Sequence, residues 1–181
     1  VKNYKFDTLY DKLGYVTQKA VLFAGSIREN VFFGESGAPE TDEELKNAIG
    51  LSQAEEFVDK LPDGAEHMIS QMGRNVSGGQ KQRLSIARAL SRKPEILVFD
   101  DSFSALDYKT DAKLREGLNE KLKDTTKIIV AQRISTIRYA DKIIVLDRGE
   151  AVGMGTHEEL MKKCDVYKEI ALSQLSAAEL A

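Results

Sequence analysis

The hydrophobic pattern divides the chain into two parts that meet near Pro94. Before this residue, apolar positions recur at helical spacing, and Ser26, Thr41 and Ser52 each stand three residues before a glutamate. That spacing is typical of a capping box, in which two side chains satisfy the free N–H groups at a helix start. The pattern therefore predicts a helix at each of these residues and an all-helical region over residues 26–91.

After Pro94, continuous apolar runs rich in β-branched residues occupy residues 96–99, 127–131 and 142–146. The runs are too short for helices and do not alternate with polar residues, which predicts strands covered on both faces. Residues 108–122 predict a helix between the first two strands. The order strand–helix–strand–helix–strand predicts parallel pairing through right-handed crossovers.

Smaller features extend this pattern at both ends. Residues 8–13 predict a short helix and residues 14–16 a short strand. Residues 147–150 predict a hairpin turn, and Thr156 precedes a glutamate by three residues and predicts another capped helix. The fold class expected from the pattern is α/β with a helical insertion.

Composition narrows the classes of protein that the chain can represent. Its 181 residues are 42% hydrophobic and 30% charged, as expected of a soluble globular protein of one domain or two subdomains. A net charge of −3 gives no basic field for nucleic acid. No apolar run approaches the roughly 20 residues that span a bilayer. Cys164, the only cysteine, fits a reducing cytosolic compartment and is expected to be buried.

The start of one predicted helix has the chemistry of an anion site. Ser77, Gly78 and Gly79 precede Gln80 and a run of apolar residues at helical spacing. Free N–H groups and the positive end of the helix dipole attract anions there, and glycine lets a ligand approach the backbone. The alternative is that Ser77 only caps the helix and that the glycines only form a tight turn.

Two runs carry a family resemblance. Residues 76–90 resemble the signature motif of ATP-binding-cassette (ABC) ATPases. Residues 96–101 form an apolar run that ends in two carboxylates, of which Asp100 is suited to Mg²⁺, although many strands end in an aspartate that caps a helix. After the signature run, residues 96–101 resemble the Walker B motif of the family, and residues 104–107 resemble its D-loop.

Further segments are similar to the exporters of this family. Residues 14–23 resemble the Q-loop segment, whose glutamine, here Gln18, contacts the metal and the region of the attacking water. Residues 23–30 are similar to the segment that opens the helical subdomain. Residues 69–75 lie where exporters contact intracellular coupling helices, and residues 128–136 match the switch loop.

The resemblance implies the C-terminal part of a P-loop NTPase (ABC ATPase) fold, with a mostly parallel sheet and an inserted helical subdomain. Residues 1–25 would end the N-terminal part of the ATPase core and contain the Q-loop. Residues 26–93 would form the helical subdomain with the signature motif. Residues 94–181 would supply the Walker B motif, D-loop, switch loop and C-terminal helices.

The resemblance also implies ATP and Mg²⁺ as cofactors and a head-to-tail dimer with a second nucleotide-binding domain. The signature residues would bind the γ-phosphate held by the other domain: Ser77, Gly78, Gly79 and Gln80. The chain's own nucleotide would be served by Asp101, Gln132, Gln18 and Asp107, and its metal by Asp100 and Gln18. The other implied partners are the coupling helices of a transmembrane domain at the cytoplasmic face of a cell membrane, with no nucleic acid.

Three departures from the family pattern modify these expectations. The Walker A motif G-x-x-x-x-G-K-[ST] is absent, so we expect a truncated chain that is inactive by itself. Asp101 stands where the family has its catalytic glutamate, and its side chain is roughly 1.5 Å shorter. Gln132 replaces the switch histidine and cannot carry a positive charge. The last two changes resemble the degenerate half of a heterodimeric exporter, whose own site hydrolyses ATP slowly or not at all.

Two alternatives remain open from the sequence. One is a non-transport ABC ATPase of the DNA-repair or chromosome type, although the interval between the Q-loop and the signature lacks the sustained heptads of a coiled coil. The other is a regulatory NTPase-like module that never hydrolyses nucleotide.

Overall fold

The computed structural model describes residues 4–34 and 37–175. The chain divides into two compact units, residues 1–130 and 131–181, and each is described by itself.

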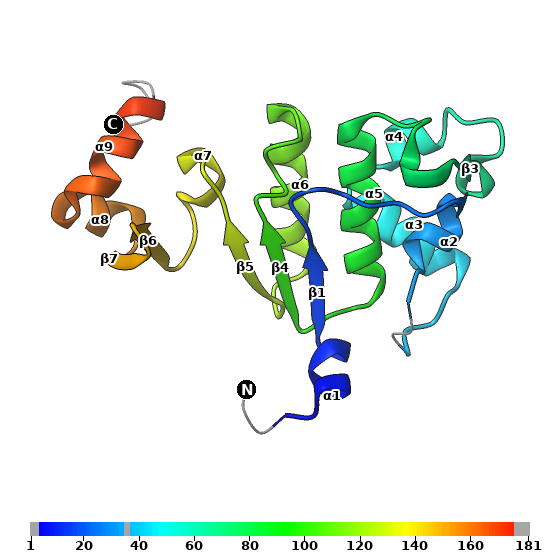
Figure 1. Cartoon of the computed structure of the whole chain (residues 1–181), viewed down its shortest axis with the longest axis horizontal. Helices are drawn as coiled ribbons and strands as arrows, with labels where there is room; N and C mark the ends of the chain where they lie inside the picture. The colour runs from blue at the N-terminus through cyan, green and yellow to red at the C-terminus, as the bar shows by residue number, and fades with distance from the viewer. Residues whose placement is uncertain (1–3, 35–36, 176–181) are drawn as a thin grey trace. The chain divides into compact units, whose positions relative to one another are not determined.

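A parallel sheet forms the centre of the first unit (Figure 1). Its strands are β1 (Leu13–Val16), β4 (Ile96–Asp100) and β5 (Thr126–Val130), in the order β1-β4-β5. The predicted parallel pairing of the second and third of these strands is confirmed. The neighbour on the other side of β4 is β1. The parallel pairing predicted for the strand at residues 142–146 is wrong, because residues 143–147 pair antiparallel with residues 150–155. All three strands run the same way, so the residues that follow β1 and β4 emerge at the same edge.

Two 14-residue helices are connected to or packed against this sheet. Helix α6 (Tyr108–Lys121) connects β4 to β5 and buries Leu114 and Leu118. Helix α5 (Gly78–Ser91) contacts β1 on one side and α2 (Ile27–Val31) and α3 (Asp42–Leu51) on the other (Figure 1). The helix predicted after the signature residues is therefore present, and it joins the sheet to the helical region.

The region predicted to be all-helical is mostly so, with one exception. It contains α2, α3, α4 (Glu55–Val58) and two 3₁₀ turns, η1 (Gly64–Glu66) and η2 (Gln71–Gly73). It also contains a short antiparallel pair, β2 (Gly25–Ser26) with β3 (Met68–Ile69), which the helical periodicity did not predict.

The predicted capping boxes have different outcomes. The boxes at Ser26 and Thr156 form in full. Thr41 caps α3 by accepting from the N–H of Glu44, whose carboxylate forms an ion pair with Lys93. The prediction at Ser52 is wrong.

Ser52 ends α3 instead of starting a helix. It is fully buried, and its hydroxyl donates to the carbonyl of Ile49 at 3.0 Å. Gln53 then adopts φ 59°, and α4 follows after Ala54, which makes no side-chain cap. The Ser52 hydroxyl is directed back toward the preceding turn, and the helix that follows begins after Ala54, so local spacing alone misassigned Ser52 as a cap.

The first helix also differs slightly from its prediction. Helix α1 covers Phe6–Asp11, two residues earlier than predicted at each end. The shift lets Leu13 begin β1.

The second unit is an antiparallel hairpin with three helices, α7 (Ile134–Ile137), α8 (His157–Lys163) and α9 (Asp165–Gln174). Strands β6 (Ile143–Asp147) and β7 (Glu150–Gly155) pair through the predicted turn, where Arg148 and Gly149 both have positive φ. Both positive values fit a tight two-residue hairpin turn.

Two strands predicted to be covered on both faces are covered on one. Ile128 and Val130 of β5 are about half exposed, and so is Ile144 of β6, whereas Ile143 and Val145 are buried. Apolar composition alone did not distinguish a strand buried on one face from a strand buried on both. Cys164 is buried, as predicted.

Candidate functional site

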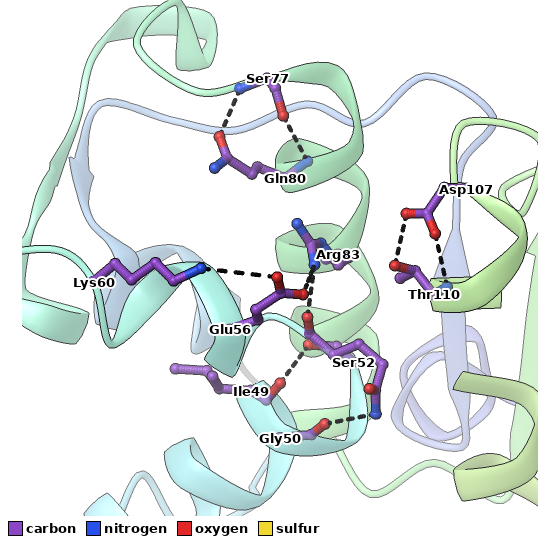
Figure 2. Close-up of polar contacts among 11 residues, drawn as sticks. Ile49, Gly50, Ser52, Glu56, Lys60, Ser77, Gln80, Arg83, Asp107 and Thr110 are labelled. Atoms are coloured by element: carbon purple, nitrogen blue, oxygen red, sulfur yellow. Dashed lines mark hydrogen bonds and ion pairs between the residues drawn. The ribbon is translucent and has the colours of Figure 1, made fainter. Parts of the chain in front are cut away.

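The signature residues form a complete helix cap at the start of α5. The Ser77 hydroxyl accepts from the N–H of Gln80 at 3.3 Å, and the Gln80 side chain accepts from the N–H of Ser77 at 2.8 Å (Figure 2). This box fixes the first turn of a 14-residue helix. It leaves the Ser77 hydroxyl hydrogen available for donation, at the end of the helix where N–H groups and the dipole favour an anion.

The glycines at this helix start meet little within the chain. A Cβ at Gly78 would have no atom within 4 Å, and one at Gly79 would meet the Ala105 carbonyl oxygen at 3.5 Å, an ordinary contact. Glycine in a helix costs about 1 kcal/mol relative to alanine. The fold of this chain therefore does not require Gly78, which points to close approach by something outside it.

A second group of predicted residues meets at the carboxyl edge of the sheet, where Asp100 ends β4. The hydroxyl of Tyr15, on the neighbouring strand β1, donates to Asp100 Oδ2 at 2.9 Å. This bond is the main cause of a raised pKa for the Tyr15 phenol. Tyr15 was not identified from the sequence, because only the pairing of β1 with β4 brings it next to Asp100.

Asp101 lies directly beyond the strand in a left-handed conformation, with φ 45°. The Asp101 N–H donates to the Val130 carbonyl at 2.9 Å, and the Asp101 carbonyl accepts from the Ser104 hydroxyl at 2.7 Å. The Gln18 side-chain amide donates to Asp101 Oδ2 at 3.2 Å. The structure thus brings together Gln18, Asp100 and Asp101, three of the residues predicted to form one site.

Asp107 begins α6 and is bound to that helix. Its carboxylate accepts from the N–H of Thr110 at 3.0 Å and from the Thr110 hydroxyl at 2.7 Å (Figure 2). The backbone bond, followed by the hydroxyl bond, lowers the pKa of Asp107. The residue predicted to contact nucleotide therefore also serves as a helix cap.

Gln132 belongs to the second unit. Its backbone carbonyl accepts from Gln174 Nε2 at 2.9 Å, and the side-chain oxygen Oε1 of Gln174 accepts from the N–H of Ile134 at 2.9 Å. One glutamine of α9 therefore braces the backbone on both sides of residue 133. No local pattern pointed to Gln174, because it lies 40 residues from Ile134 in the chain.

The residues at the sheet edge fit a magnesium ion of the kind that accompanies a nucleotide. Mg²⁺ is held in such sites by one or two carboxylates, with water and phosphate oxygens completing the octahedron. Among described residues, Asp100 Oδ1 accepts no hydrogen bond. In residues 4–34 and 37–175, no group of three or more His, Cys, Asp or Glu residues forms a metal cluster. A site that depends on phosphate oxygens needs no such cluster.

His157 contacts a tyrosine of the next helix. It is half-buried, and its Nδ1 lies 2.7 Å from the hydroxyl of Tyr167 in α9. Burial lowers the pKa of His157. The contact joins α8 to α9 and is remote in sequence from every residue predicted to bind nucleotide.

None of the helices within the described part of the chain has the length and apolar character that crossing a membrane requires.

Comparison with protein families and solved structures gives a consistent result. The ABC transporter family matches residues 2–104. The chain is 44% identical over 178 residues to the ABC transporter ATP-binding protein MG014 of Mycoplasma genitalium, covering 93% of this chain and 29% of that protein. It is 42% identical over 164 residues to an export ATP-binding/permease protein of Rickettsia felis, covering 91% of this chain and 28% of that protein.

A solved structure is similar over nearly the whole chain. A bacterial Atm1-family ABC exporter with ATP bound superposes with a TM-score of 0.91 and 34% sequence identity, covering 97% of this chain and 31% of that one. The α/β fold with a parallel sheet thus matches part of that exporter. The chain spans less than a third of the length of these relatives.

Proposed function

This chain belongs to the ABC transporter family, and from that premise we propose that it is part of the ATP-binding domain of an exporter. In this proposal the domain couples ATP binding and hydrolysis at a dimer interface to transport across a membrane. The observation that carries the proposal is the capped start of α5, where Gly78 has open space beside it. An anion brought by another chain is the ligand that this geometry fits best.

The signature residues would act on a nucleotide held by the partner. Ser77 to Gln80 would offer backbone N–H groups and the serine hydroxyl to a γ-phosphate. Preorganised donors of this kind stabilise the charge that develops during phosphoryl transfer. The capping box supports the role because it holds these donors in place before any nucleotide arrives.

The chain's own site would serve a second nucleotide with its Mg²⁺. Asp100 would bind the ion through water. Gln18 would contact the ion and the attacking water, and Asp107 would lie beside the nucleotide. Mg²⁺ would neutralise charge on the phosphates. Asp101 would take the place of the general base, with its carboxylate already bonded to the Gln18 amide.

We propose that this second site hydrolyses ATP slowly. The Asp101 side chain is one methylene shorter than glutamate, and a displacement near 1 Å of a reacting group costs about 100-fold in rate. Gln132 would contact the γ-phosphate by hydrogen bonding without a positive charge. The asymmetry of one strong and one weak site favours a heterodimer in which the partner supplies the other half of each site.

The partners and location follow from the same proposal. A second nucleotide-binding domain would pair head to tail with this one, and coupling helices of a transmembrane domain would contact residues 69–75, within the proposed helical subdomain of residues 26–93. The domain would lie at the cytoplasmic face of the membrane. Residues 1–25 and 94–181 would belong to the ATPase core.

Replacing the signature serine tests this proposal in the full-length protein with its partner. Ser77→Ala removes the hydroxyl and one half of the capping box. We expect hydrolysis at the partner's site to fall by about 100-fold, because one preorganised donor is lost. Nucleotide binding at that site should change little, since the partner's own residues hold the nucleotide. Single-turnover hydrolysis and equilibrium binding of ATP measure the two effects.

Thr156→Ala is the matched control. Thr156 also forms a full capping box, at the start of α8, and its loss costs a similar amount of helix stability, about 1 kcal/mol. The control should leave hydrolysis unchanged. Equal losses in the two variants would show that Ser77 acts only as a helix cap, and the proposal would be wrong.

A further inference from the structure

Two side chains of α5 reach the segment that carries Gln18. The Gln82 amide donates to the Thr17 carbonyl at 3.2 Å, and Arg88 Nη1 donates to the Val21 carbonyl at 2.9 Å. Thr17 is directly before Gln18, and Val21 is three residues after it. The helix that begins with the signature residues therefore contacts the Gln18 segment on both sides.

Both contacts come from side chains with little freedom. Gln82 is 1% exposed. Arg88 makes two further bonds, from Nε to the Asn30 carbonyl at 2.7 Å and from Nη2 to Asn30 Oδ1 at 3.0 Å. Its guanidinium also lies 5.4 Å from the rings of Phe23 and Phe33. A planar guanidinium with several donors engaged at once has a fixed position.

Arg88 is held by neutral acceptors. Its hydrogen bonds go to two backbone carbonyls and one side-chain amide oxygen, and burial lowers its pKa. Burying a charge without an acidic partner is costly, even when neutral dipoles compensate it. An apolar residue of similar length would fill the same space at less cost, so the bonds themselves account for an arginine here.

Bonds and packing within residues 17–22 also hold the Gln18 segment. The Thr17 hydroxyl donates to the Lys19 carbonyl at 2.8 Å, which closes a tight turn around Gln18. Beyond Val21, Leu22 is 1% exposed and anchored in the core. The Gln18 side chain in turn donates to Asp101. A continuous set of bonds thus runs from α5 through residues 17–21 to the carboxylate beyond β4.

We propose that Gln82 and Arg88 are positioning residues that bind residues 17–21 to the signature helix, so that Gln18 follows any movement of that helix. The functional consequence rests on the proposed function, in which the start of α5 binds the partner's nucleotide and Gln18 serves the nucleotide bound by this chain. The two nucleotide sites of the dimer are coupled through these two side chains. Gln82→Leu or Arg88→Gln removes one of the two contacts.

Amide exchange in the full-length protein tests the contacts without any need for hydrolysis. Gln82→Leu should raise exchange in peptides covering residues 17–23 by about 5-fold, the effect of losing one net hydrogen bond, and Arg88→Gln by at least as much, since Arg88 donates three bonds. Arg83→Gln is the matched control. Arg83 also lies on α5, where it donates to the Gln53 carbonyl at 2.9 Å, lies 5.0 Å from the Phe57 ring and forms an ion pair with Glu56 (Figure 2). These contacts are with residues 53–57 and not with residues 17–21.

The control should leave exchange in residues 17–23 unchanged. Unchanged exchange in both test variants overturns the proposal, whatever the protein's activity. If Arg88→Gln does not fold, Arg88→Lys is the substitute, because lysine keeps the positive charge but lacks the planar guanidinium that donates several bonds at once. Gln82→Leu tests the other contact independently.

A double-mutant cycle in the full-length protein with its partner tests the coupling. Gln18→Ala at the chain's own site should alter hydrolysis at the partner's site by about 5-fold or more, the lower end of typical allosteric coupling. This effect should disappear in the Gln82→Leu and Arg88→Gln backgrounds and persist in Arg83→Gln. A merely structural role would lower hydrolysis in every background without changing the effect of Gln18→Ala.

The outcomes separate the two proposals. If the effect of Gln18→Ala on hydrolysis at the partner's site is the same in all backgrounds, the coupling proposal is wrong and the proposed function is unaffected. A full-length protein that hydrolyses no ATP with its partner contradicts the proposed function, and the exchange measurement still decides whether the contacts exist.

Discussion

At the scale of single residues, replacing Gly78 should affect the stability of the fold and the activity of the site in opposite directions. No atom of the chain lies within 4 Å of a Cβ placed there. We expect Gly78→Ala to raise the free energy of unfolding by about 0.5–1 kcal/mol, because alanine favours the helix over glycine. The same methyl group should lower hydrolysis at the partner's site by about 100-fold, because it displaces the approaching phosphate by about 1 Å. Chemical denaturation and single-turnover hydrolysis measure the two effects.

Gly14→Ala is the opposite control. A Cβ at Gly14 would lie 2.8 Å from side-chain atoms of Leu97 and Pro94 and 2.9 Å from the Ala89 carbonyl oxygen. Overpacking of this kind typically costs about 1–3 kcal/mol, so this variant should lose stability. If Gly78→Ala is destabilised as well, the glycine is needed by the chain's own fold and not by a ligand.

At the scale of elements, the contact between β1 and β4 gives a pH-dependent stability. The Tyr15 phenol donates to Asp100, and this bond raises its pKa above the usual value in the folded state. Stability from a raised pKa is fully present below the unfolded pKa, about 10 for tyrosine, and is lost as pH rises through the folded value. Tyr15→Phe lacks this dependence. We therefore expect the wild-type protein to lose stability relative to Tyr15→Phe as pH rises above about 10.

Unfolding midpoints of the two proteins between pH 7 and 12 provide the measurement. The difference between them isolates Tyr15 from the other groups that titrate in alkali. A difference that stays constant over this range would contradict the bond between Tyr15 and Asp100.

Local signals explain which elements the sequence predicted well. Ser26 and Thr156 cap helices as predicted because both partners of each box lie within four residues, where spacing alone determines the contact. Ser52 has the same spacing, yet its hydroxyl bonds backward to Ile49 because tertiary burial of Ser52 favours that direction. The pattern could not distinguish these cases, since it contains no information on burial.

Contacts between distant elements account for the parts of the site that the sequence did not predict. Gln18, Asp100 and Asp101 were predicted together through a family resemblance, and they lie together in the structure. Tyr15 and Gln82 were not, because each reaches a partner at least 65 residues away. Such contacts depend on strand order and helix packing, which periodicity does not specify.

At the scale of the whole molecule, the two sets of proposed site residues differ in how they are held. The start of α5 is fixed by a reciprocal cap and has open space beside it. The carboxylate of Asp101 is short and already engaged by Gln18. Under the proposed function, a chain with this combination would contribute fully to a partner's site and weakly to its own, as expected of one half of an asymmetric dimer.

Restoring the family's residues at the weak site tests this asymmetry. We expect Asp101→Glu combined with Gln132→His, in the full-length heterodimer, to raise ADP trapped at this chain's site by about 100-fold, the gain from returning the carboxylate by about 1 Å. Because Asp101 has φ 45°, glutamate at this position carries backbone strain of about 1 kcal/mol, so the variant should unfold slightly more easily.

Two single variants divide the effect between the residues. Asp101→Glu should supply most of the increase, because it places the group that polarises the attacking water. Gln132→His alone should add little, since a charge on the phosphate does not activate water without that group. Trapped ADP that stays at the wild-type level in the double variant, while the partner's site remains active, would show that the site is slow for another reason, and the proposed asymmetry would be wrong.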